Sequence, residues 1–108
     1  MGEPRMTIPT QRVLRALLAD VAAELYGAEI AEAAGLASGT VHPILARFER
    51  IGWVESRWEE VDPREEGRPA RRYYRLTASG VSLAREALAR AYRPRPGRLV
   101  PSPLTDQP

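Results

Sequence analysis

A helix pattern, a glycine and a strand pattern follow one another without a gap between residues 38 and 60. The apolar residues of the helix pattern recur at intervals of three and four, as on one face of a helix: Val41, Ile44, Leu45, Phe48 and Ile51. Gly52 ends this pattern, and apolar and polar side chains then alternate in WVESRWEE, residues 53–60. The predicted helix and strand must therefore lie side by side, which strongly limits the possible folds.

The alternation returns in RRYYRLT, residues 71–77, after the stretch VDPREEGRPA. Two prolines and a glycine in that stretch favour a long turn. Residues 53–77 are therefore predicted to form an antiparallel hairpin, in which Trp58 and Tyr74 face inward.

Two further helix patterns precede residue 38. The first runs from about residue 9 or 10 to residue 20, and residues 21–27 are a connector. The second covers residues 27–34, where Gly35 is a typical helix end. After a short turn, Ser38 is expected to be the N-cap of the third helix.

A last helix pattern follows Thr77, which is suited to cap it, and extends to about residue 92. Beyond it the chain is rich in proline, which favours disorder. The predicted organisation is a flexible arm over residues 1–8, one folded domain over residues 9–92 and a disordered tail over residues 93–108.

The composition excludes several classes of protein. A chain of 108 residues fits one small domain, and it contains no cysteine and one histidine, His42. Neither a metal site nor a catalytic arrangement is evident, so we expect no cofactor, no metal and no enzyme. No apolar run is long enough to cross a membrane, and we expect a cytoplasmic protein without membrane contact.

All 16 basic residues are arginine, although the net charge is only +2. A coding bias towards arginine would explain this. Recognition of phosphates and base edges would explain it equally, because the guanidinium group forms paired hydrogen bonds with such groups. Composition alone cannot distinguish these two explanations.

The order of elements predicts a mainly α-helical fold with a small β-hairpin. Two short helices joined by a tight turn allow the second to enter a major groove, and a hairpin after it reaches the adjacent backbone. This is a winged helix-turn-helix, with a three-helix core and a wing. It predicts double-stranded DNA as the partner.

Two segments, SGTVHPILARFERIGWVESRWEE and GRPARRYYRLTASG, closely resemble the PadR family of winged-helix transcriptional regulators. The resemblance covers about residues 10–92. It is carried by these positions: Gly39, Thr40, Pro43, Glu49, Gly52, Arg72, Tyr73, Tyr74, Leu76, Thr77 and Gly80. The family usually has tyrosine before the proline, where this chain has His42. The resemblance implies a transcriptional regulator, which we expect to be a repressor.

The candidate DNA contacts lie on the third helix and the wing: Ser38, Gly39, Thr40, His42, Pro43, Arg47, Arg50, Arg68, Arg71, Arg72 and Tyr73. On the helix, the arginines could instead form an ordinary solvated face, and Thr40 could be a local cap. On the wing, the arginines could serve as edge charges that prevent sheet aggregation. The acidic residues of the hairpin are expected to point away from DNA.

Both faces of the last helix are rather apolar, and one monomer can cover only one of them. The residues predicted to form a homodimer are Leu83, Ala87, Leu88 and Ala91. In the PadR family this helix mediates dimerisation. Two-fold symmetry then predicts a pseudo-palindromic operator with half-sites about 34–36 Å apart.

Some functional questions stay open in the sequence. PadR-like regulators often sense small molecules, but no residue here identifies an effector. A winged-helix module that binds protein, or a DNA-binding accessory factor of a mobile element, remains an alternative to the homodimeric repressor.

Overall fold

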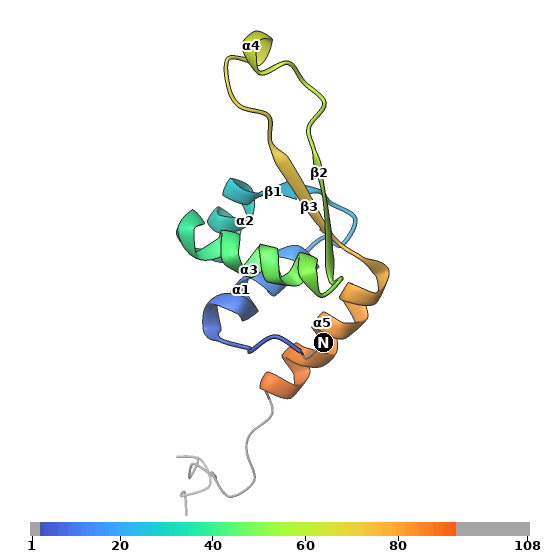
Figure 1. Ribbon diagram of the computed structural model, residues 1–108. Coiled ribbons are helices and arrows are strands. Elements are labelled where there is room, and N and C mark those ends of the chain that lie inside the picture. Colours follow the sequence, from blue (N-terminus) through green and yellow to red (C-terminus); the bar gives the residue numbers. More distant parts are fainter. Residues whose placement is uncertain (1–2, 93–108) are drawn as a thin grey trace, which may run out of the picture.

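The computed structural model describes residues 3–92, in which a long hairpin rises from a helical body (Figure 1). The elements in chain order are α1 (Ile8–Leu18), β1 (Leu25–Tyr26), α2 (Gly27–Ala34), α3 (Ser38–Arg50), β2 (Val54–Trp58), α4 (Pro63–Glu66), β3 (Arg72–Leu76) and α5 (Ala78–Ala91). The mainly helical fold with a small sheet confirms the predicted winged helix-turn-helix. We call residues 54–76, which contain β2, α4 and β3, the wing.

The sheet has three antiparallel strands in the order β1-β3-β2. Val54 lies opposite Leu76 at the base of the wing, and Trp58 lies opposite Arg72 further out. The predicted hairpin is therefore confirmed. The third strand, β1, falls within the stretch that the sequence indicated only as a connector, because its two residues are too few to show an alternating pattern.

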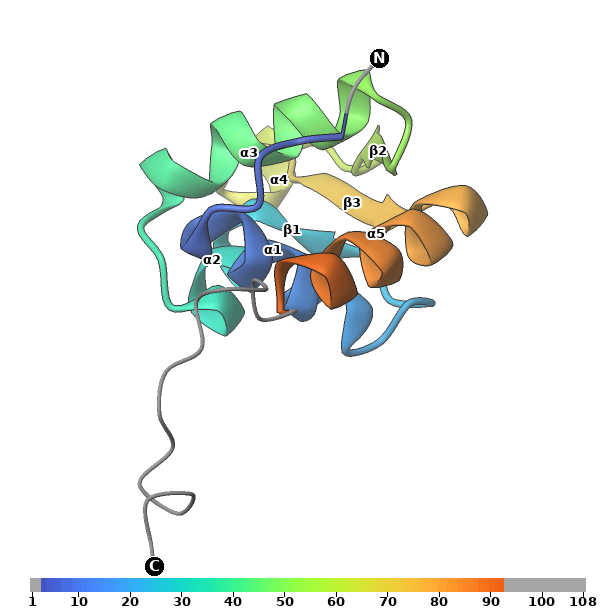
Figure 2. The ribbon, with the colours of Figure 1, turned by 90° about the horizontal axis from the view of Figure 1, so that it is seen from below.

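The core lies where α1, α2 and α3 meet the base of the sheet. Its largest fully buried apolar side chains are Phe48, Leu14, Ile30, Leu45, Val13 and Val41. Phe48 stacks on Trp53, with ring centroids 5.7 Å apart and an interplanar angle of 13°. Tyr74 is buried, as predicted. In Figure 2, α1 lies between α3 and α5, so it is the central helix of the body.

The helix ends agree with the sequence except at the first and third helices. Helix α1 begins at Ile8, because the Thr7 side chain accepts a hydrogen bond from the Thr10 backbone N–H. Helix α2 has the predicted bounds, with Gly35 in the left-handed conformation at φ 69°. The predicted N-cap of α3 was wrong: Ala37 is the cap, without a side-chain hydrogen bond, and Ser38 is the first helical residue.

At the last helix, Thr77 caps α5 as expected. Its Oγ1 accepts a hydrogen bond from the Gly80 N–H at 2.9 Å. The same hydroxyl donates to the Gly52 carbonyl at 2.8 Å, so the start of α5 is tied to the turn after α3.

The outer half of the wing differs from the prediction. Trp58 was expected to face inward among core residues, but it is 58% exposed. Alternation gave it the correct strand face, but the wing extends beyond the helical body (Figure 1), which accounts for the exposure of the ring. The predicted turn also contains the short helix α4, which Asp62 caps by accepting a hydrogen bond from the Arg64 N–H.

Residues 3–7 of the expected flexible arm contact the body. Pro4 is buried, and the Gln11 side-chain amide donates to the Met6 carbonyl at 2.8 Å. Glu3 pairs with Arg90 of α5. The tail predicted over residues 93–108 lies outside the described residues.

Gly80 occupies a position where α5 passes against the backbone after α3. A methyl group there would overlap the Trp53 carbonyl oxygen and lie 2.8 Å from the carbonyl carbon, so the backbone would have to shift. We expect Gly80→Ala to reduce the free energy of unfolding by about 2–4 kcal/mol, measured by chemical denaturation.

Gly39→Ala is the matched control, because Gly39 also lies in the first turn of a helix but has no atom within 4 Å of an added methyl group. We expect this variant to be neutral or stabilised by up to about 1 kcal/mol. Equal effects of the two substitutions would contradict the close approach at Gly80.

Candidate nucleic-acid interface

The side of α3 opposite the core is exposed along its whole length. The exposed residues include all the candidate contacts on this helix: Ser38, Gly39, Thr40, His42, Pro43, Arg47 and Arg50. They alternate with the buried stripe because the helix is amphipathic. Within residues 3–92, neither Arg47 nor Arg50 forms an ion pair with a carboxylate. Their guanidinium groups are therefore available to an external anion.

His42 lies on α3 at the point where this helix passes the start of α2. A methyl group on Gly27, the first residue of α2, would come within 2.9 Å of the His42 Cε1 atom. The imidazole therefore lies directly over the start of α2 while remaining exposed. The absence of a side chain at Gly27 leaves room for the imidazole in this position.

A groove separates His42 and the start of α2 from the middle of the wing, where Trp58 lies opposite Arg72. It has a volume of about 560 Å³, and α2, α3 and both wing strands contribute to its wall. Among its lining side chains are Tyr26, His42, Trp58, Arg71 and Arg72. The structure thus brings together candidate DNA contacts from α3 and from the wing.

The predicted wing arginines have different surroundings. Arg68 donates to both carboxylate oxygens of Glu59, at 2.7 and 3.1 Å, and it also lies 3.7 Å from Glu66. The Arg71 guanidinium lies over the Tyr26 ring, 4.3 Å from its centroid, and pairs with no carboxylate in the described part of the chain. Arg71 is therefore freer than Arg68 to contact DNA.

Arg72, the third predicted wing contact, points back towards α3. Its Nη2 donates to the Glu49 carboxylate at 3.2 Å, and its Nε donates to the Ser56 hydroxyl at 2.9 Å. Two of its nitrogens are thus engaged within the chain. Sequence reasoning had no means to find this pair, because its members are 23 residues apart.

The outer face of the wing is also held by arginines. Arg57 forms two hydrogen bonds with Glu24, at 2.8 and 2.7 Å, and Arg75 donates to Glu55 at 2.9 Å. The candidate contact Tyr73 lies on this face, half-buried, with the Arg57 guanidinium 5.2 Å from its ring centroid. Tyr73 therefore packs against an arginine of the wing.

The wing carries no net charge. Residues 54–76 contain six arginines and six carboxylates, which cancel. Four of the carboxylates gather around α4 at the outer end of the wing: Glu60, Asp62, Glu65 and Glu66 (Figure 1). The free positive charge of the candidate interface is therefore on α3 and at Arg71, and not spread over the wing.

Two of the wing ion pairs shift carboxyl pKa values. The hydrogen bonds from Arg68, together with one from the Arg71 backbone N–H, lower the pKa of Glu59 from 4.5 to about 2. The hydrogen bonds from Arg57 likewise lower the pKa of Glu24. Both carboxylates are therefore ionised at neutral pH and bound to their arginines.

The residues predicted to form a dimer do not share one exposed face. Leu83 is 40% exposed, Ala91 is exposed and Leu88 is half-buried. Ala87 is fully buried within the monomer, which corrects its assignment to an outward face. Small side chains at this point allow α5 to pack closely on the body.

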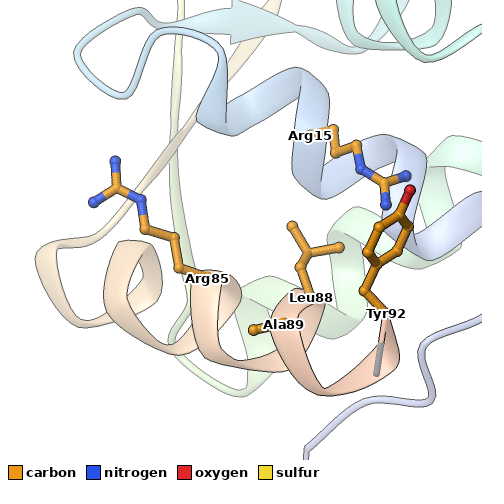
Figure 3. Close-up of a pocket in the computed structure, with 5 residues that line it drawn as sticks. All are labelled: Arg15, Arg85, Leu88, Ala89 and Tyr92. Atoms are coloured by element: carbon orange, nitrogen blue, oxygen red, sulfur yellow. The ribbon is translucent and has the colours of Figure 1, made fainter. Parts of the chain in front are cut away.

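A second pocket lies between α1 and α5, on the side of the body away from the wing. Its volume is about 570 Å³, and it is lined by Arg15, Arg85, Leu88, Ala89 and Tyr92. In Figure 3, Arg15 reaches from α1 towards the ring of Tyr92, whereas Arg85 points away from it along α5. Sequence reasoning missed Arg15 and Tyr92, because only the fold brings the two helices together.

Other kinds of site are not found in the described residues. Between residues 3 and 92, no group of three His, Asp or Glu side chains is arranged to hold a metal ion. In the same range, no helix is both long and apolar enough to cross a membrane.

Comparison with protein families identifies one match. The model described as "Transcriptional regulator PadR-like family" matches residues 16–86, which include α2, α3 and the wing. No curated protein sequence matches the chain.

Several solved structures of transcriptional regulators have a similar fold. MepR, a transcription regulator of the Staphylococcus aureus multidrug efflux pump MepA, has a TM-score of 0.57 and 25% identity over 75% of this chain. A MepR–DNA complex has a TM-score of 0.59, 25% identity and 77% coverage. PcaV from Streptomyces coelicolor, in complex with its natural ligand, has a TM-score of 0.64, 27% identity and 84% coverage. The aligned region spans only 54%, 62% and 59% of these three proteins.

The lowered pKa of Glu59 predicts how the wing responds to acid. A carboxyl group whose pKa falls from 4.5 to about 2 on folding stabilises the folded state above pH 4.5, and this contribution is lost as the pH falls towards 2. We expect Glu59→Gln to lower the thermal midpoint at pH 7. The difference from the wild type should shrink below pH 4.5, as measured by circular dichroism between pH 2 and 7.

Glu60→Gln is the control, because the exposed Glu60 side chain forms no ion pair in the described structure. It should have the same midpoint as the wild type at pH 7. A Glu59→Gln effect that is independent of pH would contradict the ion pair.

Proposed function

This chain belongs to the PadR-like family of transcriptional regulators, and on that premise we propose that it is a homodimeric repressor that binds a pseudo-palindromic DNA operator. A regulator rather than an enzyme is what the sequence predicted. The observation that carries the proposal is the exposed polar side of α3, which lies beside the groove under the middle of the wing and has two arginines without an ion pair among residues 3–92.

In the proposed complex, α3 enters the major groove. Arg47 and Arg50 reach base edges or phosphates, because an arginine can form two parallel hydrogen bonds with a guanine or a phosphate. Ser38 and Thr40 are exposed at the start of the helix, where the free backbone N–H groups also favour a phosphate. Arg71, on the wing, contacts the adjacent sugar-phosphate backbone of the DNA.

The proposed homodimer uses the apolar surface of α5 and its surroundings. Leu83 is 40% exposed, Tyr92 at the end of α5 is 80% exposed and Ile8 at the start of α1 is 62% exposed. A symmetric pair of chains would bury such side chains and present two α3 helices to half-sites about 34–36 Å apart.

A small-molecule effector is a further part of the proposal. PcaV was solved with its natural ligand. In this chain the pocket between α1 and α5 has a suitable size, and Arg15 and Arg85 at its wall favour a ligand with a negative charge. Its position beside the proposed dimer surface would allow a ligand to influence how the two chains pair. The identity of such an effector stays open.

Arg47 is the residue with which to test base reading. Selection from random duplexes would first supply a binding site, and affinity would then be measured at several salt concentrations. The logarithm of the affinity should fall linearly with the logarithm of the salt concentration, with a slope of about −0.9 for each phosphate that the protein contacts. We expect Arg47→Gln to cost about 1–3 kcal/mol of binding free energy and to relax sequence preference.

Arg12→Gln is the control, because Arg12 is also exposed and unpaired among the described residues but lies on α1. It should bind as the wild type does.

Arg71→Gln should weaken binding to all sequences alike. An affinity that does not respond to salt would reject the proposal and favour a protein-binding winged helix. Salt-dependent binding without sequence preference would favour the accessory factor of a mobile element.

Leu83 tests the proposed dimer. We expect Leu83→Glu to convert a dimer into a monomer in analytical ultracentrifugation, because a charge cannot be buried in an apolar interface without a partner. Val21→Glu is the control, since Val21 is similarly exposed, at 37%, but lies outside α5. A wild-type chain that sediments as a monomer at all concentrations would contradict the dimer.

A further inference from the structure

Three side chains from three elements meet where the wing leaves the body. Glu49 comes from the last turn of α3, Ser56 from β2 and Arg72 from β3. The Ser56 hydroxyl donates to Glu49 Oε2 at 2.6 Å and accepts from Arg72 Nε at 2.9 Å. Arg72 Nη2 closes the triangle with distances of 3.2 and 3.3 Å to the two Glu49 oxygens.

Aromatic rings fix the same guanidinium group from the wing side. The Arg72 Cζ atom lies 5.4 Å from the centroid of the Trp58 ring and 6.0 Å from that of Tyr74. Trp58 lies directly opposite Arg72 in the hairpin register. Contact with an aromatic face stabilises a cation, so Arg72 is held by its hydrogen bonds and by these rings together.

These hydrogen bonds have a particular place in the fold. Within residues 3–92, they are the side-chain hydrogen bonds that join α3 to the wing strands. The strand β1 supports the wing only next to Tyr73 and Tyr74, and the chain passes from α3 to β2 through Gly52 at φ 84°. The other attachments of the wing to the body, which are the β1–β3 pairing, the Arg57–Glu24 hydrogen bonds and the Arg71–Tyr26 contact, do not involve a side chain of α3.

We propose that Glu49, Ser56 and Arg72 form a clamp that fixes the wing relative to α3, so that Arg72 serves DNA binding as a positioning residue and not as a contact. This inference rests on the proposed function, in which α3 and the wing bind one duplex together. The clamp lowers the entropic cost of binding because both surfaces are already oriented.

The clamp and simple electrostatics predict effects of opposite sign at Glu49. A carboxylate beside a DNA-binding surface repels phosphates, so its removal alone should strengthen binding. If the carboxylate holds the wing in place, its removal should weaken binding. Glu49→Gln therefore separates the two roles by the direction of the change.

The test compares Glu49→Gln, Arg72→Gln and the double variant with the wild type, on the selected duplex at several salt concentrations. We expect each single variant to bind about 3- to 10-fold more weakly, and the double variant no more than about 2-fold weaker than either single one. The salt slope of Arg72→Gln should equal that of the wild type, whereas loss of a phosphate contact would reduce it by about 0.9.

Glu55→Gln and Arg75→Gln are matched controls. This pair is 2.9 Å apart and similarly exposed, and it joins the same two strands on the other face of the wing without reaching α3. Glu55→Gln changes the net charge as Glu49→Gln does. Both control variants should bind within about 2-fold of the wild type.

Hydrogen exchange of the backbone amides of β2 and β3, measured in the free protein, provides a readout without DNA. Exchange should be faster in Glu49→Gln than in the wild type or Glu55→Gln, because the wing opens more often. Faster exchange in a protein whose wild type binds no duplex would support the clamp and overturn only the proposed function. Wild-type binding that Glu49→Gln leaves equal or stronger would overturn the clamp.

Discussion

The close packing around the turn after α3 determines the rest of the structure. Phe48 stacks on Trp53 across this turn, and the Trp53 N–H donates to the Phe48 carbonyl at 2.9 Å. Thr77 binds the same turn, because its backbone N–H donates to the Trp53 carbonyl and its hydroxyl to the Gly52 carbonyl. The end of α3, the start of β2 and the start of α5 are therefore fixed at one point, and their directions follow from it.

The arrangement of charge adds a third explanation for a chain whose basic residues are all arginine. Ion pairs or aromatic rings engage most of the wing arginines within the chain, and the planar guanidinium group suits both kinds of contact. Lysine would provide the charge without the paired hydrogen bonds. Arginine in the wing therefore stabilises a narrow, weakly covered hairpin, while the arginines of α3 form no ion pair in the part of the chain that the structure describes.

The sequence predicted those features that depend on local pattern. Periodicity located the helices, and alternation located the hairpin, because neighbouring residues determine both. The exposure of Trp58 could not be predicted in this way, since alternation gives the face of a strand but not the extent of the body that covers it. Sequence alone indicated Arg72 as a DNA contact or an edge charge, because its partner Glu49 is brought to it only by the fold. The burial of Ala87 likewise depends on how α5 packs.

The same turn connects the two surfaces on which the proposed function depends. The Thr77 hydroxyl bonds to both the Gly80 N–H of α5 and the Gly52 carbonyl that follows α3. Gly80 allows α5 to lie against this backbone without a side chain between them. A rotation of α5 must therefore either break these hydrogen bonds or move the end of α3. The β2–β3 ladder pairs Val54 with Leu76 directly beside this contact, so the start of β2 and the end of β3 are held at the same point.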